Sequence, residues 1–244
     1  MKKTVSTSRK PHKSTEKRRR IAINYAIVPL CAVAQDPLAR SAFERQRLGS
    51  LNVVLGIAGM TVAAYALFFL YDWLTVRRPS VPSAPLFALA FALNVAAAAL
   101  LLISQVPAAP KDGMFFAGLT GALLFGIALI WALFFALPKG TYASPQVGRT
   151  CFKQGMYALC RHPGVLWYCL AFAFLALMLR TPESALSCAI LCAGDVAYML
   201  LQDAWTFPAT FSDYRDYRAT TPLLLPNAVS LRAALRPVGE GGGL

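Results

Sequence analysis

Charged residues are scarce in this chain. Only 14% of its 244 residues are Asp, Glu, Lys or Arg, whereas 57% are hydrophobic. A soluble domain usually has about 25% charged residues, so this chain has too little polar surface to cover itself in water. A bilayer resolves the shortage, because lipid solvates apolar faces. The composition therefore predicts an integral membrane protein.

Acidic residues are the scarcer of the two charge types. The chain has 11 Asp and Glu against 24 Lys and Arg, and nine of these basic residues fall within residues 1–20. This polar segment is too hydrophilic to form a core, and a basic flank of this kind is attracted to anionic lipid. No other feature is typical of a nucleic-acid-binding module. We therefore expect a disordered basic tail that faces a membrane, and no nucleic-acid partner.

Histidine is also rare, with only His12 and His162 in the whole chain, and none of the six cysteines forms a C-x-x-C pair. Cys169, Cys188 and Cys192 lie in the predicted apolar helices and Cys31 in the earlier apolar run, where cysteine behaves as a small apolar packing residue. Disulfides are rare on the cytoplasmic side of a membrane. We expect neither a metal site nor a disulfide framework.

Five apolar stretches are candidates for membrane helices, each of which needs about 20 apolar residues to span a bilayer. Residues 51–73, 86–106 and 114–137 have the full length, whereas 165–179 and 185–201 are shorter and are separated by "TPES". We predict an all-α integral membrane protein with about five transmembrane helices, of which the last two form a short hairpin. The predicted divisions are a tail at 1–20, a segment at 21–50, a three-helix region at 51–137, the hairpin region at 138–227 and a flexible tail at 228–244.

The orientation of these helices follows from the positions of basic residues, which are enriched in cytoplasmic loops. Basic residues concentrate between the third and fourth stretches and again after the fifth, so we expect both regions, including an amphipathic C-terminal segment, to face the cytoplasm of a bacterial inner (plasma) membrane. The segment 21–37 is either a short span or an interfacial helix. The basic residues are Lys139, Arg149, Lys153 and Arg161 in the first region, and Arg215, Arg218, Arg232 and Arg236 in the second.

An Arg-His-Pro sequence stands directly before the fourth apolar stretch. Pro163 suits the first turn of a helix because it lacks an N–H group that would be unpaired there. Arg161 and His162 would then lie beside the positive end of that helix, which attracts anions. The alternative is structural: an arginine that reaches the interface and a histidine that caps the helix.

A second element follows the last apolar stretch and reads "QDAWTFPATFSDYRDYRATTPLLLPN" over residues 202–227. The two elements together resemble the isoprenylcysteine carboxyl methyltransferase and phospholipid methyltransferase superfamily. That family has G-x-Y-x-x-x-R-H-P before a helical hairpin, then an acidic pair, F-G-x-x-Y-x-x-Y and P-x-x-x-P. The matching residues are Gly155, Tyr157, Arg161, His162 and Pro163 in the first element, and Phe211, Ser212, Tyr214, Tyr217, Pro222 and Pro226 in the second. The chain departs from the family pattern at Val165, Trp167 and the Gln202-Asp203 pair, which marks it as a variant member.

The resemblance implies an enzyme with S-adenosylmethionine as cofactor and a lipophilic acceptor such as a prenyl-thiol carboxylate or a lipid amine. Arg161 would bind the carboxylate of the cofactor, Asp203 its ribose or amine, and His162 would anchor the cofactor or act as a base. The implied catalytic residues are Arg161, His162 and Asp203, and the implied cofactor-binding residues are Gly155, Tyr157, Arg161, His162, Pro163, Gln202, Asp203 and Tyr214. Two alternatives stay open: a sterol-reductase-like enzyme with a nicotinamide cofactor, and a non-catalytic membrane protein descended from the family.

Asp195 stands inside the last apolar stretch, where an ionisable residue is costly and usually faces protein or water. Helical spacing places it on one face with Tyr198 and Gln202 and, less closely, with Asp203. This face is expected to point toward the cofactor region. Asp195 itself either makes a structural hydrogen bond to a neighbouring helix or takes part in the function of the protein.

Overall fold

The computed structural model describes residues 37–137 and 149–235. The chain divides into two compact units, Met1–Ser50 and Leu51–Leu244. The predicted basic tail lies outside the described residues, and so does nearly all of the segment 21–37, together with Lys139 and Arg236. The second unit carries all the candidate site residues.

Four helices in the described ranges are long and apolar enough to cross a membrane. They comprise Arg47–Arg77 within α2 (Pro37–Arg77), then α3 (Ala84–Gln105), α4 (Gly113–Phe134) and the continuous stretch Pro182–Thr210. The three full-length apolar helices predicted from the sequence are thereby confirmed. The fourth predicted segment forms α6 (Pro163–Leu179), whose 17 residues extend about 25 Å, less than a bilayer core of about 30 Å. No strand occurs in the two described ranges, where Arg149 and Phe211 form an isolated bridge.

The last apolar helix is longer than predicted. α7 (Pro182–Leu201) continues through a π-helical turn, η1 (Gln202–Thr206), into α8 (Phe207–Thr210). The prediction that this arm is short is therefore wrong. Its start is well defined, because the Thr181 side chain accepts a hydrogen bond from the Ser184 N–H group in a capping box. A π-helical turn contains more residues than an α-helical one, so η1 shifts the directions of the side chains around it.

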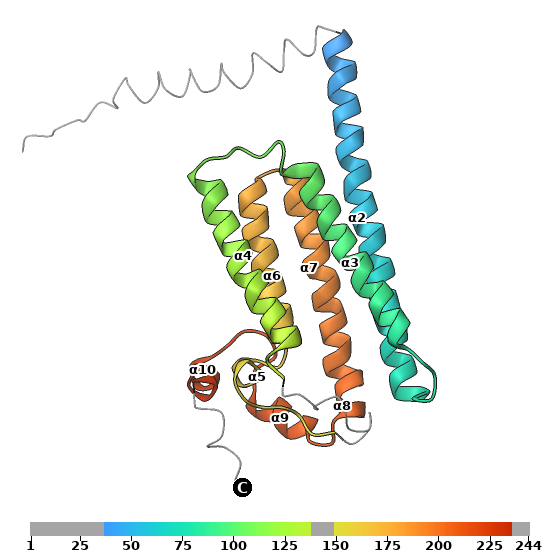
Figure 1. Cartoon of the computed structure of the whole chain (residues 1–244), viewed down its shortest axis with the longest axis vertical. Coiled ribbons are helices and arrows are strands. Elements are labelled where there is room, and N and C mark those ends of the chain that lie inside the picture. The colour runs from blue at the N-terminus through green and yellow to red at the C-terminus, as the bar shows by residue number, and fades with distance from the viewer. Residues whose placement is uncertain (1–36, 138–148, 236–244) are drawn as a thin grey trace, which may run out of the picture. The chain divides into compact units, whose positions relative to one another are not determined.

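Small residues allow α4 and α6 to pack closely. A Cβ atom on Gly118 would lie 2.6 Å from the backbone nitrogen of Met178, and one on Gly121 would lie 2.1 Å from a ring atom of Phe174. Glycine at such positions lets two helix backbones approach, as is common in membrane helix pairs. In Figure 1, α4, α6 and α7 run side by side.

The outer faces of α3 and α4 keep large apolar side chains exposed. Ile103, Ile127 and Phe134 are 75%, 65% and 63% exposed. A soluble monomer rarely exposes so many large apolar groups, whereas a bilayer solvates them. Together with the four long apolar helices, this surface marks the chain as an integral membrane protein.

Three short helices lie together with α8 at one end of α4, α6 and α7 (Figure 1). They are α5 (Met156–Leu159), α9 (Tyr214–Thr220) and α10 (Ala228–Ala234). In α9, two of the motif tyrosines, Tyr214 and Tyr217, are buried and only 3% and 4% exposed. α10 begins with a capping box at Asn227, so residues 228–234 are helical where the sequence predicts a flexible tail.

Candidate functional site

The loop before α6 delivers the Arg-His-Pro residues to the end of the bundle. Gly155 precedes α5 with φ 58° and ψ −127°, a conformation that is strained for a residue with a Cβ atom. A Cβ atom there would meet no neighbour within 4 Å, so the backbone angle, and not the available space, favours glycine. α5 follows, and Pro163 then starts α6 directly after Arg161 and His162.

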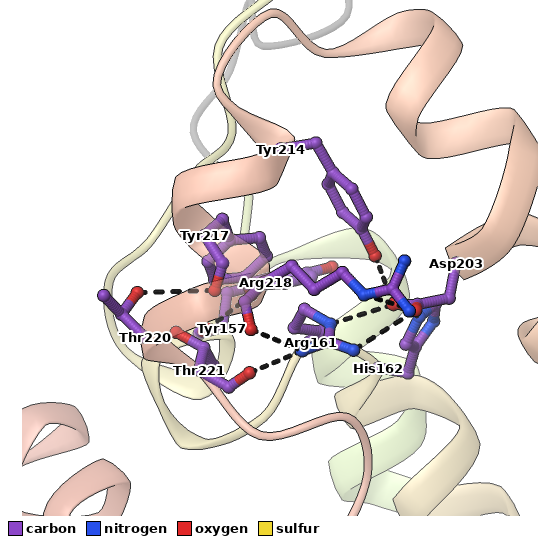
Figure 2. Close-up of polar contacts among 9 residues, drawn as sticks. All are labelled: Tyr157, Arg161, His162, Asp203, Tyr214, Tyr217, Arg218, Thr220 and Thr221. Atoms are coloured by element: carbon purple, nitrogen blue, oxygen red, sulfur yellow. Dashed lines mark hydrogen bonds and ion pairs between the residues drawn. The ribbon is translucent and has the colours of Figure 1, made fainter.

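Arg161 and Asp203 form a buried, two-pronged ion pair (Figure 2). The Arg161 Nε and Nη2 groups donate to the two Asp203 carboxylate oxygens at 2.8 and 3.2 Å. Nη1 donates to the backbone carbonyls of Arg218 and Thr221 at 3.1 and 2.7 Å. Four of the five N–H groups of Arg161 are therefore used within the protein. This arginine joins the start of α6, the π-helical turn and the C-terminal segment.

The Asp203 carboxylate accepts further contacts at the centre of the site. The Tyr214 hydroxyl donates to Oδ1 at 2.5 Å, and His162 Nε2 lies 3.4 Å from the same oxygen. Arg218 Nε approaches Oδ2 at 3.7 Å. Burial and the neighbouring Asp203 carboxylate raise the pKa of Tyr214 above its usual value, so its phenol stays protonated and acts as a donor. Figure 2 shows these groups pointing toward Asp203.

His162 is neutral in this environment. Burial lowers its pKa to about 4 and outweighs the Asp203 carboxylate, which acts in the opposite direction. The imidazole stacks on the Phe207 ring, with a centroid distance of 5.4 Å and an interplanar angle of 10°. Its position near the carboxylate favours the tautomer with the proton on Nε2. His162 therefore contributes a hydrogen-bond donor rather than a charge.

Backbone and tyrosine contacts bind the C-terminal segment to the loop before α6. The Arg161 N–H group donates to the Pro222 carbonyl at 2.9 Å, and the Tyr217 hydroxyl donates to the Tyr157 carbonyl at 2.5 Å. Tyr157 in turn donates through its own hydroxyl to the Ala132 carbonyl in α4 at 3.2 Å. Two sequence elements about 60 residues apart thus form one unit.

Most of the residues implied by the resemblance meet here. Arg161, His162, Asp203 and Tyr214 are in direct contact, with Tyr157 and Pro163 adjacent in the same loop and helix start. Gln202 does not join them, because its amide donates to Asp72 Oδ2 of α2 at 3.1 Å, as does the Thr206 hydroxyl at 3.1 Å. The expectation that Gln202 and Asp203 share one face is therefore wrong. The two are adjacent on a helical turn, and their side chains point to different neighbours.

Two site residues were missed by the sequence reasoning. Arg218 lies four residues after Tyr214, on the same face of α9, and this spacing could have indicated it. Phe207 stacks on His162 only because the helix continues beyond Leu201, which the predicted boundary excluded.

No protein-family model matches the chain, and neither a curated protein nor a solved structure was found to be similar to it. The resemblance to membrane methyltransferases therefore rests on the motifs and their order.

Proposed function

We propose that this protein transfers a methyl group from S-adenosylmethionine to a lipophilic acceptor at the cytoplasmic face of a membrane. The lone pair of the acceptor forms the new bond to the methyl carbon, while the methyl–sulfur bond breaks and its electron pair stays on sulfur. The protein needs mainly to align the two reactants and to exclude water. Alignment of this kind can be worth about 7–11 kcal/mol.

One observation carries the proposal: the residues of the two family-like elements converge at one end of a set of apolar helices. Arg161 and Asp203 are 42 positions apart and share two hydrogen bonds, and Tyr214 donates to the same carboxylate. A site at the end of membrane helices suits a reaction between a water-soluble donor and a membrane-soluble acceptor. Donor and acceptor would reach it from the two different phases.

In this proposal Arg161 positions the other site residues and does not contact the donor. Because its N–H groups are already engaged, the carboxylate of the donor is better suited to Arg218, whose side chain is 56% exposed beside Asp203. The first-turn amides of α6, after Pro163, lie next to the same cluster and favour a negative charge. Arg218 and the start of α6 would thus hold the carboxylate end of the donor.

Trp167 provides a test of whether the donor fits. Its indole Nε1 is buried and has no hydrogen-bond partner within the described ranges, and its ring stacks on Phe125. An unpaired buried donor costs about 1–3 kcal/mol, and a ligand that accepts a hydrogen bond would remove this cost. Adenine ring nitrogens and ribose oxygens are such acceptors. Trp167 lies four positions after Pro163, just over one helical turn from the start of α6.

Binding of labelled S-adenosylmethionine to the detergent-purified protein tests the proposal. We expect saturable binding that a nicotinamide dinucleotide does not displace. Arg218→Gln should weaken it at least tenfold, or about 1.4 kcal/mol. Arg215→Gln is the matched control, because Arg215 is an exposed arginine on the same short helix, and its affinity should equal that of the wild type.

Other results would identify the alternatives. Binding of the nicotinamide dinucleotide in place of S-adenosylmethionine would favour a sterol-reductase-like enzyme. Binding of neither would favour a non-catalytic descendant of the family, a possibility with its own support in the mutual engagement of Arg161 and Asp203. Equal affinities of wild type and Arg218→Gln would reject the carboxylate site assigned above while leaving the methyl donor in place.

A further inference from the structure

The chain after α9 is strongly apolar, although it lies at the polar end of the bundle. Residues 222–235 read "PLLLPNAVSLRAAL", with five Leu, one Val and three Ala, and Arg232 is the single charged residue among them. The stretch is too short for a membrane span, which needs about 20 apolar residues. We call residues 222–235 the C-terminal apolar segment.

The large apolar side chains of α10 point outward. Val229, Leu231 and Leu235 are 72%, 51% and 77% exposed. Arg232 is exposed beside them, whereas Ser230 is only 3% exposed. Helical spacing places the four exposed residues on one half of the helix and Ser230 on the other. The outward half of α10 is therefore apolar and carries one positive charge.

The contacts of α10 place it level with the end of a membrane helix. α10 packs on α5, and the Tyr157 hydroxyl of α5 donates to the Ala132 carbonyl at 3.2 Å, two residues before α4 ends at Phe134. The same end of α4 exposes Trp131 and Phe135, and Trp and Tyr side chains are enriched at the membrane–water interface. The outward half of α10 is thus at the depth where lipid headgroups begin.

The C-terminal apolar segment starts at the carbonyl groups that hold Arg161. The Arg161 N–H group donates to the Pro222 carbonyl at 2.9 Å, and Nη1 donates to the Thr221 carbonyl at 2.7 Å. Only five residues separate Pro222 from the start of α10, and Pro226 among them restricts the backbone. A fixed position of α10 would therefore hold the backbone that Arg161 binds.

We propose that the C-terminal apolar segment docks on the surface of the membrane and binds anionic lipid there. The outward half of α10 lies in the boundary between acyl chains and headgroups, where an apolar helix face is stable. Arg232 binds an anionic headgroup, because the planar guanidinium matches phosphate oxygens and a negative surface attracts basic residues. This docking depends neither on methyl transfer nor on its donor.

Photo-crosslinking of the full-length protein in nanodiscs tests the proposal. A diazirine-bearing leucine analogue is placed at position 229 or 235, and the nanodiscs contain equal amounts of phosphatidylglycerol and phosphatidylcholine. After irradiation, mass spectrometry distinguishes adducts with lipid, with protein and with water. We expect lipid adducts at both positions. Position 216 is the matched control, because Asp216 is an exposed residue of the other short helix, α9, and water adducts should dominate there.

The same measurement tests the role of Arg232. Phosphatidylglycerol adducts at position 229 should exceed phosphatidylcholine adducts about fivefold, which corresponds to about 1 kcal/mol for one basic residue. Arg232→Gln should reduce this ratio to about one, because it removes the positive charge. Arg215→Gln removes an exposed arginine from α9 and should leave the ratio unchanged.

Three results would contradict the proposal. A lipid yield at positions 229 and 235 no higher than at position 216 would overturn it. Protein adducts at these positions would overturn it in favour of a second copy of the chain, or another segment of the same chain, on this face. Equal yields of the two lipids in the wild type would overturn the binding of an anionic headgroup by Arg232. Binding of labelled S-adenosylmethionine to the same nanodiscs tests the proposed function separately, so either conclusion can fail without the other.

Discussion

Replacing Arg161 with lysine tests whether the site needs the two-pronged guanidinium contacts of Arg161 or only its positive charge. Lysine keeps the charge and can still reach one oxygen of Asp203, but it has three donors on a single nitrogen and lacks the planar geometry of the guanidinium. Arg161 uses four N–H groups, two toward Asp203 and two toward the carbonyls of Arg218 and Thr221. A single ammonium cannot satisfy acceptors on both sides, so about two hydrogen bonds should be lost.

The magnitude follows from burial. A hydrogen bond that involves a charged group contributes about 1.5–3 kcal/mol, and Arg161 and Asp203 have only 7% of their side-chain surfaces exposed. Loss of two bonds, partly compensated by movement of the lysine, gives an expected cost of about 3 kcal/mol. Complete removal in Arg161→Ala should approach the cost of breaking a buried pair, about 3–5 kcal/mol.

Arg180→Lys provides a matched comparison at the opposite end of α6. Arg180 also makes a two-pronged contact with an aspartate, Asp112, at 3.0 and 2.9 Å, but the two side chains are 31% and 53% exposed. Exposed pairs contribute much less to stability than buried ones, because water screens the two charges. Unfolding by SDS titration, followed by tryptophan fluorescence, would measure both variants. If Arg161→Lys proves as stable as wild type, or no less stable than Arg180→Lys, then Arg161 contributes only a positive charge at the interface. In that case its two-pronged contact with Asp203 does not stabilise the fold.

Three further predictions concern pH, packing and orientation. Burial lowers the pKa of His162 to about 4, so the unfolded chain takes up a proton near pH 6.5 before the folded protein does. The free energy of unfolding should therefore be full above pH 6.5 and fall by about 2 kcal/mol between pH 7 and pH 5. In SDS titrations at these two pH values His162→Gln should lose less stability than the wild type, and equal losses would contradict a neutral, buried His162. Gly118→Ala forces a Cβ atom to within 2.6 Å of the Met178 backbone and should cost about 1–3 kcal/mol, whereas Gly126→Ala on the same helix, which has open space, should cost nothing measurable in the same assay. A single cysteine introduced as Arg215→Cys in a cysteine-free background should react with an impermeant maleimide only from the cytoplasmic side, and labelling in intact cells would refute the predicted orientation.

The extent of the membrane helices follows closely from local sequence. Long apolar runs bounded by proline, glycine and charged residues located α3 and α4 to within a few residues. The end of α7 was not located in this way, because Gln202 and Asp203 resemble a polar boundary. In the structure these two residues sit in a π-helical turn, and their polarity is accommodated by Asp72 on one side and by Arg161 on the other. Composition alone does not reveal such partners, so it places the end of this helix too early.

The sequence by itself determined that the chain is helical and membrane-embedded, and it indicated Arg161, His162, Asp203 and Tyr214 as members of one site. The first conclusion depends on composition and on the length of the apolar runs, which are local properties, whereas the second comes from the resemblance of two sequence elements to a family pattern. Only the tertiary structure decided how the members pair. In the structure the Arg161 guanidinium binds Asp203 and two backbone carbonyls. Gln202 points toward α2, and Arg218 lies exposed beside Asp203. The same folding brought the Tyr168 hydroxyl of α6 within 2.9 Å of the Asn94 side chain of α3. Such pairings depend on which helix faces meet, and no periodicity within a single helix specifies its neighbour.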